Sequence, residues 1–324
     1  MKSLMVFVPL LILAISNPAC REFGEVALHS NLQLETLVES SGLALSKQFK
    51  SIVWTHNDSG DGPIFYAFTL AGEAMGQVEL DGVSAADWEG MAIGPCGEQT
   101  CLYAGDIGSS RREASEMLIW RIVEPRPPGP GQSLSLQAER LVVSFEDPPF
   151  DAEGLAADPQ NGDLILIEKS LAPIFRAYRL PADAWQSGSY AAEILDRIQL
   201  HGGLEASLVT QADIDPSGAE LFIGTYSGGF LLPVLRRDGR ISGFGEAKAG
   251  PIYGQGQCEA AAYGVDGLSL WFTCEAADTP LAVARCAELN SSEPAPAESC
   301  SCSGVGSGWW LLFVWLLGRK RGSV

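Results

Sequence analysis

The chain has 324 residues and carries 40 acidic and 21 basic side chains, which give a formal net charge of -19 at pH 7. This charge argues against nucleic-acid binding, which needs clustered Lys and Arg, and a hydrophobic content of 46% argues against general disorder. The 36 glycines and 19 prolines favour many short strands joined by turns. The three histidines, His29, His56 and His201, lack metal-ligand spacing.

The N-terminus has the features of an exported protein. Lys2 precedes an apolar run over residues 4–15, so we interpret residues 1–19 as a secretory signal peptide, with a buried helix as the alternative. Cleavage after Ala19 would leave Cys20 at the mature N-terminus, where it is a candidate for lipidation. The residues before Cys20 lack the usual Leu at the third position back, which leaves lipidation open.

Residues 22–290 contain a recurring segment, at intervals of roughly 50–60 residues. Each copy begins with a hydroxyl or acidic residue and is followed by further strand-length runs bounded by Gly, Pro, Asp and Asn. Four strands repeated in this way are typical of a β-propeller. We therefore predict an all-β, five-bladed propeller with four antiparallel strands per blade, six blades being the alternative. The segment Leu32–Leu37 would complete the last blade and close the ring. We expect a monomer.

The first residues of the five copies define the candidate metal site. The first strand of each propeller blade lines the central channel, so these side chains would form a ring, and three of them are carboxylates that repel one another when buried. Calcium suits such oxygens, because it accepts about six to eight oxygen ligands, whereas zinc prefers His and Cys. The alternative is that these side chains only bond backbone amides. The predicted ligands of a structural calcium are Ser41, Glu89, Glu153, Thr210 and Glu259.

The order of these lead residues resembles a known family. Ser-Gly-Leu at 41–43, Glu-Gly-Met at 89–91 and Glu-Gly-Leu at 153–155 are similar to segments of the SdiA-regulated (YjiK-like) five-bladed propellers of bacteria. The alternation of hydroxyl and acid also resembles the calcium-activated nucleotidases, in which an axial calcium is held this way. The first resemblance implies the fold and a calcium, but no settled reaction. Thr-Gln-Ala at 210–212 and Glu-Ala at 259–260 depart from the pattern, which could loosen one side of the site.

A second group of residues would lie on the same face, because the second strand of each blade ends where the first begins. Together with the ion they could bind and hydrolyse a phosphate or ester, or they are only turn-forming acids and solvated charges. His56, Asp61, Arg111 and Arg112 would lie nearby. The candidates are Asp58, Asp106, Glu168, Lys169 and Glu275.

Eight cysteines fit an oxidising compartment. A disulfide between Cys96 and Cys101 could link the two strands of a hairpin. Cys258 is placed to form a disulfide with Cys274 across the first two strands of a blade. The partner of Cys286 is open.

The C-terminus forms a three-part tail. Residues 291–303 are a linker that contains Cys300 and Cys302, and residues 304–324 contain an apolar run followed by basic residues. The run is shorter than the roughly 20 residues that cross a bilayer. The tail resembles the sorting signals of myxobacterial surface proteins, which implies processing near these cysteines. The alternative is a hydrophobic tail that is buried in the fold. We expect membrane attachment through the processed termini, at the surface or outer membrane of a Gram-negative bacterium.

Two functions remain from the sequence. The first is a calcium-binding, surface-anchored propeller that serves as a binding or scaffold module for an unidentified extracellular ligand or protein. The second is a calcium-dependent hydrolase of phosphoesters (nucleotidase- or phytase-like) or of lactones. The few basic residues near the predicted mouth give little support for an anionic substrate, so we favour the binding module.

Overall fold

The computed structural model describes residues 20, 22–58, 60–108, 116–147, 151–202, 206, 208–254 and 257–287. The signal peptide, Arg111 and Arg112, and the tail with Cys300 and Cys302 lie outside the described residues. In the described part of the chain, no helix is long and apolar enough to cross a membrane.

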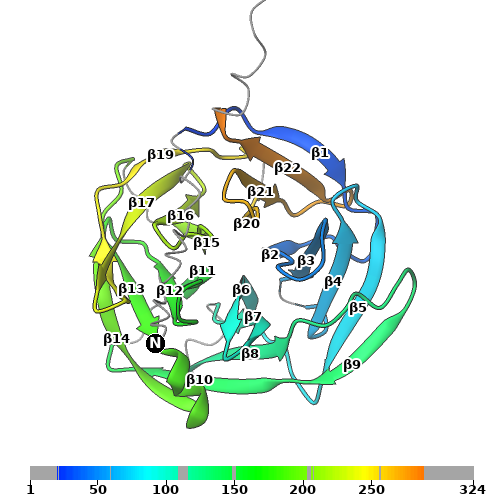
Figure 1. Cartoon of the computed structure of the whole chain (residues 1–324), viewed down its shortest axis with the longest axis horizontal. Coiled ribbons are helices and arrows are strands. Elements are labelled where there is room, and N and C mark those ends of the chain that lie inside the picture. The colour runs from blue at the N-terminus through cyan, green and yellow to red at the C-terminus, as the bar shows by residue number, and fades with distance from the viewer. Residues whose placement is uncertain are drawn as a thin grey trace, which may run out of the picture. The chain divides into compact units, whose positions relative to one another are not determined.

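The strands are arranged radially around a common centre, and each sheet runs outward from an inner strand (Figure 1). Each inner strand contacts the next, and the last contacts the first, so the inner strands form a closed cycle. This arrangement defines a β-propeller. Apolar side chains of neighbouring sheets pack together to form the core. The inner strands are β2 (Ser40–Leu45), β6 (Trp88–Cys96), β11 (Asp151–Ala157), β15 (Val209–Ile214) and β20 (Ala260–Tyr263).

The described strands form four hydrogen-bonded sheets. Two four-stranded meanders merge into one eight-stranded sheet, because the outer strands of both pair in parallel. A second parallel pair adds β9 to the edge of the first sheet. Both parallel pairs lie outside the antiparallel four-strand units that the sequence predicted. The first sheet contains β2, β3 (Ile52–Asn57), β4 (Ile64–Thr69), β5 (Ala74–Asp81) and β9 (Ser133–Gln137). The eight-stranded sheet joins β6, β7 (Gln99–Asp106), β8 (Glu116–Val123) and β10 (Glu139–Phe145) to β11, β12 (Leu164–Lys169), β13 (Phe175–Leu180) and β14 (Ser189–Ile198). The third sheet contains β15, β16 (Glu220–Thr225), β17 (Gly228–Arg237), β18 (Arg240–Phe244) and β19 (Lys248–Gly250), and the last contains β20, β21 (Ser269–Thr273), β22 (Pro280–Arg285) and β1 (Ala27–Asn31).

An N-terminal strand closes the ring, but it lies earlier than the sequence indicated. β1 pairs antiparallel with β22, and the two lie side by side in Figure 1. The segment Leu32–Leu37, which we expected to be this strand, follows it as a turn. Leu32 and Leu37 are both buried in the core. The apolar alternation of this segment therefore reflects burial of individual side chains rather than strand pairing.

Three disulfides join described residues. Cys96 is bonded to Cys101 and Cys258 to Cys274, the two pairs that the sequence indicated. The third joins Cys20 to Cys286, next to the ring closure. A sulfur atom in a disulfide cannot also carry the thioether of a lipid, so this bond favours a structural role for Cys20, whose lipidation the sequence left open. Disulfides of this kind are consistent with an extracellular protein.

We expect removal of the Cys20–Cys286 bond to destabilise the fold more than removal of the Cys96–Cys101 bond. The first spans 266 residues and the second only 5, and the entropy that a cross-link removes from the unfolded chain grows with loop length. Replacing each pair with Ser should lower the free energy of unfolding by about 5 kcal/mol and about 2 kcal/mol, respectively. Urea unfolding measures both values, and equal losses would contradict this order.

Candidate metal centre

The register of the inner strands is interrupted at the residues that the sequence singled out. β2 slips at Ser41, β11 at Glu153 and β15 at Thr210. In β6 the slip includes Glu89, and Glu259 lies immediately before β20. A β-bulge releases a residue from pairing and re-aims its side chain. The repeated bulge thus explains how similar positions of separate strands face one point.

Three buried carboxylates meet at this point. Glu89, Glu153 and Glu259 each offer an oxygen, and these oxygens all lie within 4.8 Å of one another. The three residues are only 3–7% exposed. Ser41, Thr210 and Glu259 line an adjoining cavity of about 10 Å³, which has room for one water molecule or ion. The oxygens and the cavity together could hold a metal ion.

A hydrogen-bond donor among the described residues reaches each of the three carboxylates. Ser41 Oγ donates to Glu89 Oε2 over 3.1 Å, and Tyr226 Oη donates to Glu259 Oε1 over 2.6 Å. Lys169 Nζ forms an ion pair with Glu153 and also donates to Tyr226 Oη over 3.2 Å. Lys169 was predicted to lie near the ring, and the structure shows that its ammonium group supplies positive charge directly to it.

Several acceptors next to the carboxylates lack a donor. Glu153 Oε2, Thr210 Oγ1 and Gln211 Oε1 have no hydrogen-bond partner among the described residues, and all three residues are at most 3% exposed. A buried oxygen without a partner costs free energy. Because Glu153 Oε2 and Thr210 Oγ1 can act as metal ligands, a cation at this point would satisfy them.

The electrostatics of the site favour protonation when no cation is bound. Burial, and then the charge of Glu153, raises the pKa of Glu89 to about 11. Burial also raises the pKa of Glu153 to about 8, although Lys169 opposes the shift. Burial and the nearby Glu259 raise the pKa of Glu275 to about 7. These carboxylates therefore need a counter-cation to be ionised together.

We expect the metal-free protein to lose stability as the pH rises from about 4.5, the ordinary pKa of Glu153, through about 8, its pKa in the folded state. Because its pKa is higher in the folded state, Glu153 binds its proton more tightly there than in the unfolded chain. Its contribution to the free energy of unfolding is therefore complete below the pKa of the unfolded state and is lost as the pH rises through the pKa of the folded state. Calcium should reverse most of this loss, because it favours the ionised form. Urea unfolding with chelator and with calcium, in wild type and in Glu153→Gln, measures the effect. An identical pH dependence in the metal-free variant would contradict it.

In β15 the residue after Thr210 is Gln211 rather than the glycine found after Ser41, and a glycine on the neighbouring strand compensates for this change. In β2 the residue after Ser41 is Gly42, and a Cβ atom there would come within 2.2 Å of the ring of His56, its partner in β3. In β15 the large residue is Gln211 and its partner is Gly224, where a Cβ atom would meet Gln211 at 2.2 Å. The large and small residues have exchanged strands, so Thr210 keeps its place.

The second group of candidates is only partly brought together. Asp58 lies with Asp87 and Glu89 in a further cluster of carboxylate oxygens within 4.8 Å of one another, and Glu275 interacts electrostatically with Asp58. Asp106 is fully buried and accepts a hydrogen bond from the backbone of Asp87 over 3.0 Å, so it positions that residue. Sequence reasoning missed Asp87, whose one available signal was its place two residues before Glu89.

Glu168 and His56 are each held by partners outside the three converging carboxylates. Glu168 receives hydrogen bonds from the guanidinium of Arg176 over 2.8 and 2.5 Å, so it serves an ion pair rather than the ring. Complete burial lowers the pKa of His56 to about 4, and its Nδ1 contacts the backbone oxygen of Asn57 at 2.9 Å. His56 is therefore a neutral core residue at physiological pH.

Comparison with known proteins finds no matching family model and no matching curated protein. The chain is similar to the PQQ-bound aldose sugar dehydrogenase of Streptomyces coelicolor (13% identity, 83% of this chain and 99% of that chain, TM-score 0.45). It is also similar to a gluconolactonase of Xanthomonas campestris (14%, 76% and 71%, TM-score 0.42) and to a chain of a nidogen–laminin complex (15%, 72% and 72%, TM-score 0.43). Similarities this remote carry no argument about function, and the propeller assignment rests on the closed cycle of inner strands.

Proposed function

We propose that this chain is a secreted, surface-attached propeller of five blades that binds one structural calcium on its axis and serves as a binding or scaffold module. The eight-stranded sheet counts as two blades, because only its outer strands β10 and β14 join the two meanders. Each blade then contributes one inner strand. The resemblance to the SdiA-regulated propellers supports the same count and the same axial ion, and membership of that family is part of the proposal.

One observation carries the calcium assignment: three buried glutamates converge beside further oxygens that lack a donor. All the candidate ligands are oxygens, which excludes the preferred donor set of zinc. Calcium tolerates many ligands and irregular geometry, whereas magnesium demands near-ideal octahedral geometry and keeps several waters. A cavity with room for about one water molecule leaves little space for a hydrated magnesium ion.

Calcium titration of the chelator-treated protein tests this function. We expect calorimetry to show one calcium per chain and thermal unfolding to shift upward with calcium concentration, because a ligand that binds only the folded state stabilises it. Magnesium should bind more weakly and stabilise less. Absence of any calcium-dependent shift at millimolar calcium would refute the assignment.

The proposed location follows from the cysteines and the tail. The disulfides are consistent with export, and the bonding of Cys20 to Cys286 supports a scheme without an N-terminal lipid. We therefore infer that attachment uses the C-terminal tail with Cys300 and Cys302. Deleting residues 291–324 should release the protein into the medium, whereas Cys20→Ser should leave it cell-attached.

A calcium-dependent hydrolase is the second candidate, and the cluster of Asp58, Asp87 and Glu89 favours it. These acids share Glu89 with the axial ring, so an ion there would border a group able to position a water molecule or a substrate. Phosphatase, esterase and lactonase assays with and without calcium separate the two functions. The binding module predicts no turnover in any assay, and calcium-dependent turnover of one substrate class would replace it with the hydrolase.

A further inference from the structure

A cavity of about 450 Å³ lies between the first and last sheets, away from the carboxylates. It is formed by the β2–β3 hairpin on one side and by β21 and β22 on the other. Ser41 is near the start of β2, whereas the cavity is lined by Leu45 at its end. The cavity therefore belongs to the opposite end of the inner strand from the candidate metal centre. Its volume lies within the range of about 300–1,000 Å³ usual for small-molecule sites.

Part of the cavity lining is apolar. Leu45, Ile52 and Trp271 line it and are 3–9% exposed, so they are held in place by the core. Trp271 is fixed further by a hydrogen bond from its Nε1 to Ser269 Oγ over 3.1 Å, and by an edge-on contact with His29 at 5.0 Å between ring centroids. These side chains give the cavity a rigid apolar base, and its more open apolar surface comes from the half-buried Leu70 and from Val265, which is 58% exposed.

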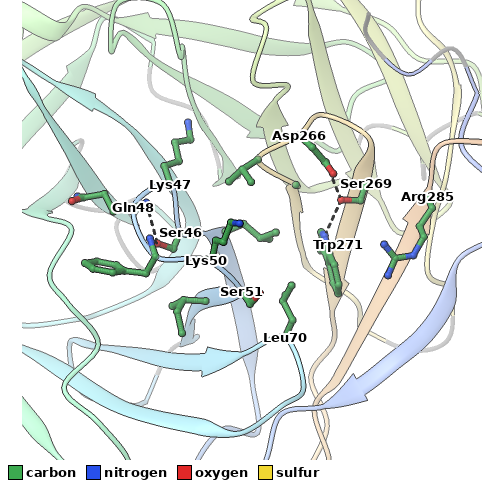
Figure 2. Close-up of a pocket in the computed structure, with 15 residues that line it drawn as sticks. Ser46, Lys47, Gln48, Lys50, Ser51, Leu70, Asp266, Ser269, Trp271 and Arg285 are labelled. Carbon is green, nitrogen blue, oxygen red and sulfur yellow. Dashed lines mark hydrogen bonds between the residues drawn. The ribbon is translucent and has the colours of Figure 1, made fainter. Parts of the chain in front are cut away.

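Positive charge gathers at the rim of this cavity. Three of the chain's 21 basic residues line it, in a protein whose net charge is -19. Lys47 interacts with Asp213 and Glu124, which lie outside the cavity lining, so the cationic pair that faces the cavity is Lys50 and Arg285. In Figure 2 the guanidinium of Arg285 turns toward Trp271 while Lys50 lies across the cavity. The guanidinium carbon is 5.8 Å from the centre of the indole ring.

Among the polar groups of the cavity, one buried hydroxyl donor is available, and one oxygen of the acidic side chain is already hydrogen-bonded. Asp266, the acidic residue of the lining, already accepts hydrogen bonds from the backbone of Leu268 over 2.9 Å and from Ser269 Oγ over 3.5 Å. Ser46 is 6% exposed, and its Oγ accepts a bond from the backbone of Phe49 over 2.8 Å. Its hydroxyl proton has no acceptor among the described residues. The cavity thus presents cations and a hydroxyl donor, which favour an anion.

We propose that this cavity binds a small organic anion with an apolar body. The apolar body packs on the open apolar lining, which includes Leu70 and Val265, and the anionic head lies between Lys50 and Arg285. The site is independent of the axial calcium, because no residue of the metal centre lines it.

Calorimetric titration of the full-length protein with 2-naphthoate, and with the neutral 2-naphthamide of the same shape, tests the proposal. We expect saturable binding of one 2-naphthoate per chain, in calcium and in chelator, and binding of 2-naphthamide at least about tenfold weaker, because each tenfold corresponds to about 1.4 kcal/mol of lost interaction. Equal affinity for the two compounds, or no saturable binding of 2-naphthoate, would overturn it.

Charge-removing variants locate the site. Lys50→Gln with Arg285→Gln should weaken 2-naphthoate binding about tenfold, to the level of 2-naphthamide, while leaving 2-naphthamide binding unchanged. Arg240→Gln with Lys248→Gln, two exposed residues outside the cavity, removes the same charge and should leave both affinities unchanged. Wild-type affinity for 2-naphthoate in the Lys50 and Arg285 variant, at an unchanged melting temperature, would refute this location.

Discussion

Glu89→Gln together with Glu153→Gln is expected to abolish the rise in melting temperature that calcium gives the wild-type protein. Each substitution removes a carboxylate from the trio whose oxygens lie within 4.8 Å of one another, and a neutral amide oxygen attracts calcium far less strongly than a carboxylate. The metal-free variant should still fold, since Gln keeps the shape of Glu. At Glu89 it also mimics the protonated side chain that a pKa of about 11 implies in the absence of metal.

Differential scanning calorimetry in chelator and in excess calcium measures this effect. Glu73→Gln with Glu79→Gln is the matched control, because both residues are exposed and the variant loses the same two charges. The control should keep the full calcium-dependent shift. A double variant of the ring that still gains stability with calcium would show that the ion, if bound, is held elsewhere.

Lys169→Met is expected to raise the affinity for calcium by at least about tenfold, which corresponds to about 1.4 kcal/mol. The Lys169 ammonium group forms an ion pair with Oε1 of Glu153, which is 3% exposed, so calcium bound at the unpaired Oε2 competes with Lys169 for the same negative charge and is expected to displace it. The variant removes both this competition and the repulsion between two cations. The same change should destabilise the metal-free protein, because Glu153 then loses its counter-cation in a buried site.

Titration calorimetry of both proteins measures the change in affinity, and chelator-treated samples give the loss in melting temperature. Lys248→Met, an exposed residue outside the ring, should change neither value. Weaker calcium binding in Lys169→Met would contradict the displacement, and would indicate that Lys169 helps to organise the ion-bound site.

The sequence was informative about the inner strands for a physical reason. Residues such as Ser41 and Glu153 recur in register because each must bulge out of its strand toward the axis, and Gly42 and Gly90 follow because inner strands approach too closely for a Cβ atom. Residue type is therefore constrained at the lead position of each copy, and the convergence of the glutamates could be predicted.

The outer strands left a weaker signal. Strand β9 adds to the edge of β5 through backbone hydrogen bonds, while most of its side chains are exposed, so no apolar pattern marked its partner. The same applies to β1, whose residues are mostly exposed, whereas the buried Leu32 and Leu37 beyond it gave the misleading alternation. Edge pairing depends on where a connection ends in space, which one sequence does not encode locally.

The choice of ionic partners was also beyond sequence reasoning. Lys169 and Glu168 are adjacent at the end of β12, yet Lys169 bonds to Glu153 while Glu168 bonds to Arg176. Successive side chains of a strand point to opposite faces, and only the packed structure shows which charges each face meets. Asp87 was missed for a related reason, because its place beside Asp58 depends on the position held by Asp106.

A crystal structure of the calcium-loaded protein, with anomalous scattering used to locate the ion, is the most direct measurement. We expect a single calcium on the axis, with oxygens of Glu89, Glu153 and Glu259 at about 2.3–2.6 Å and with Lys169 turned away from Glu153. An axis that holds only water and the Lys169 ammonium at saturating calcium, or an ion bound outside the three glutamates, would contradict it.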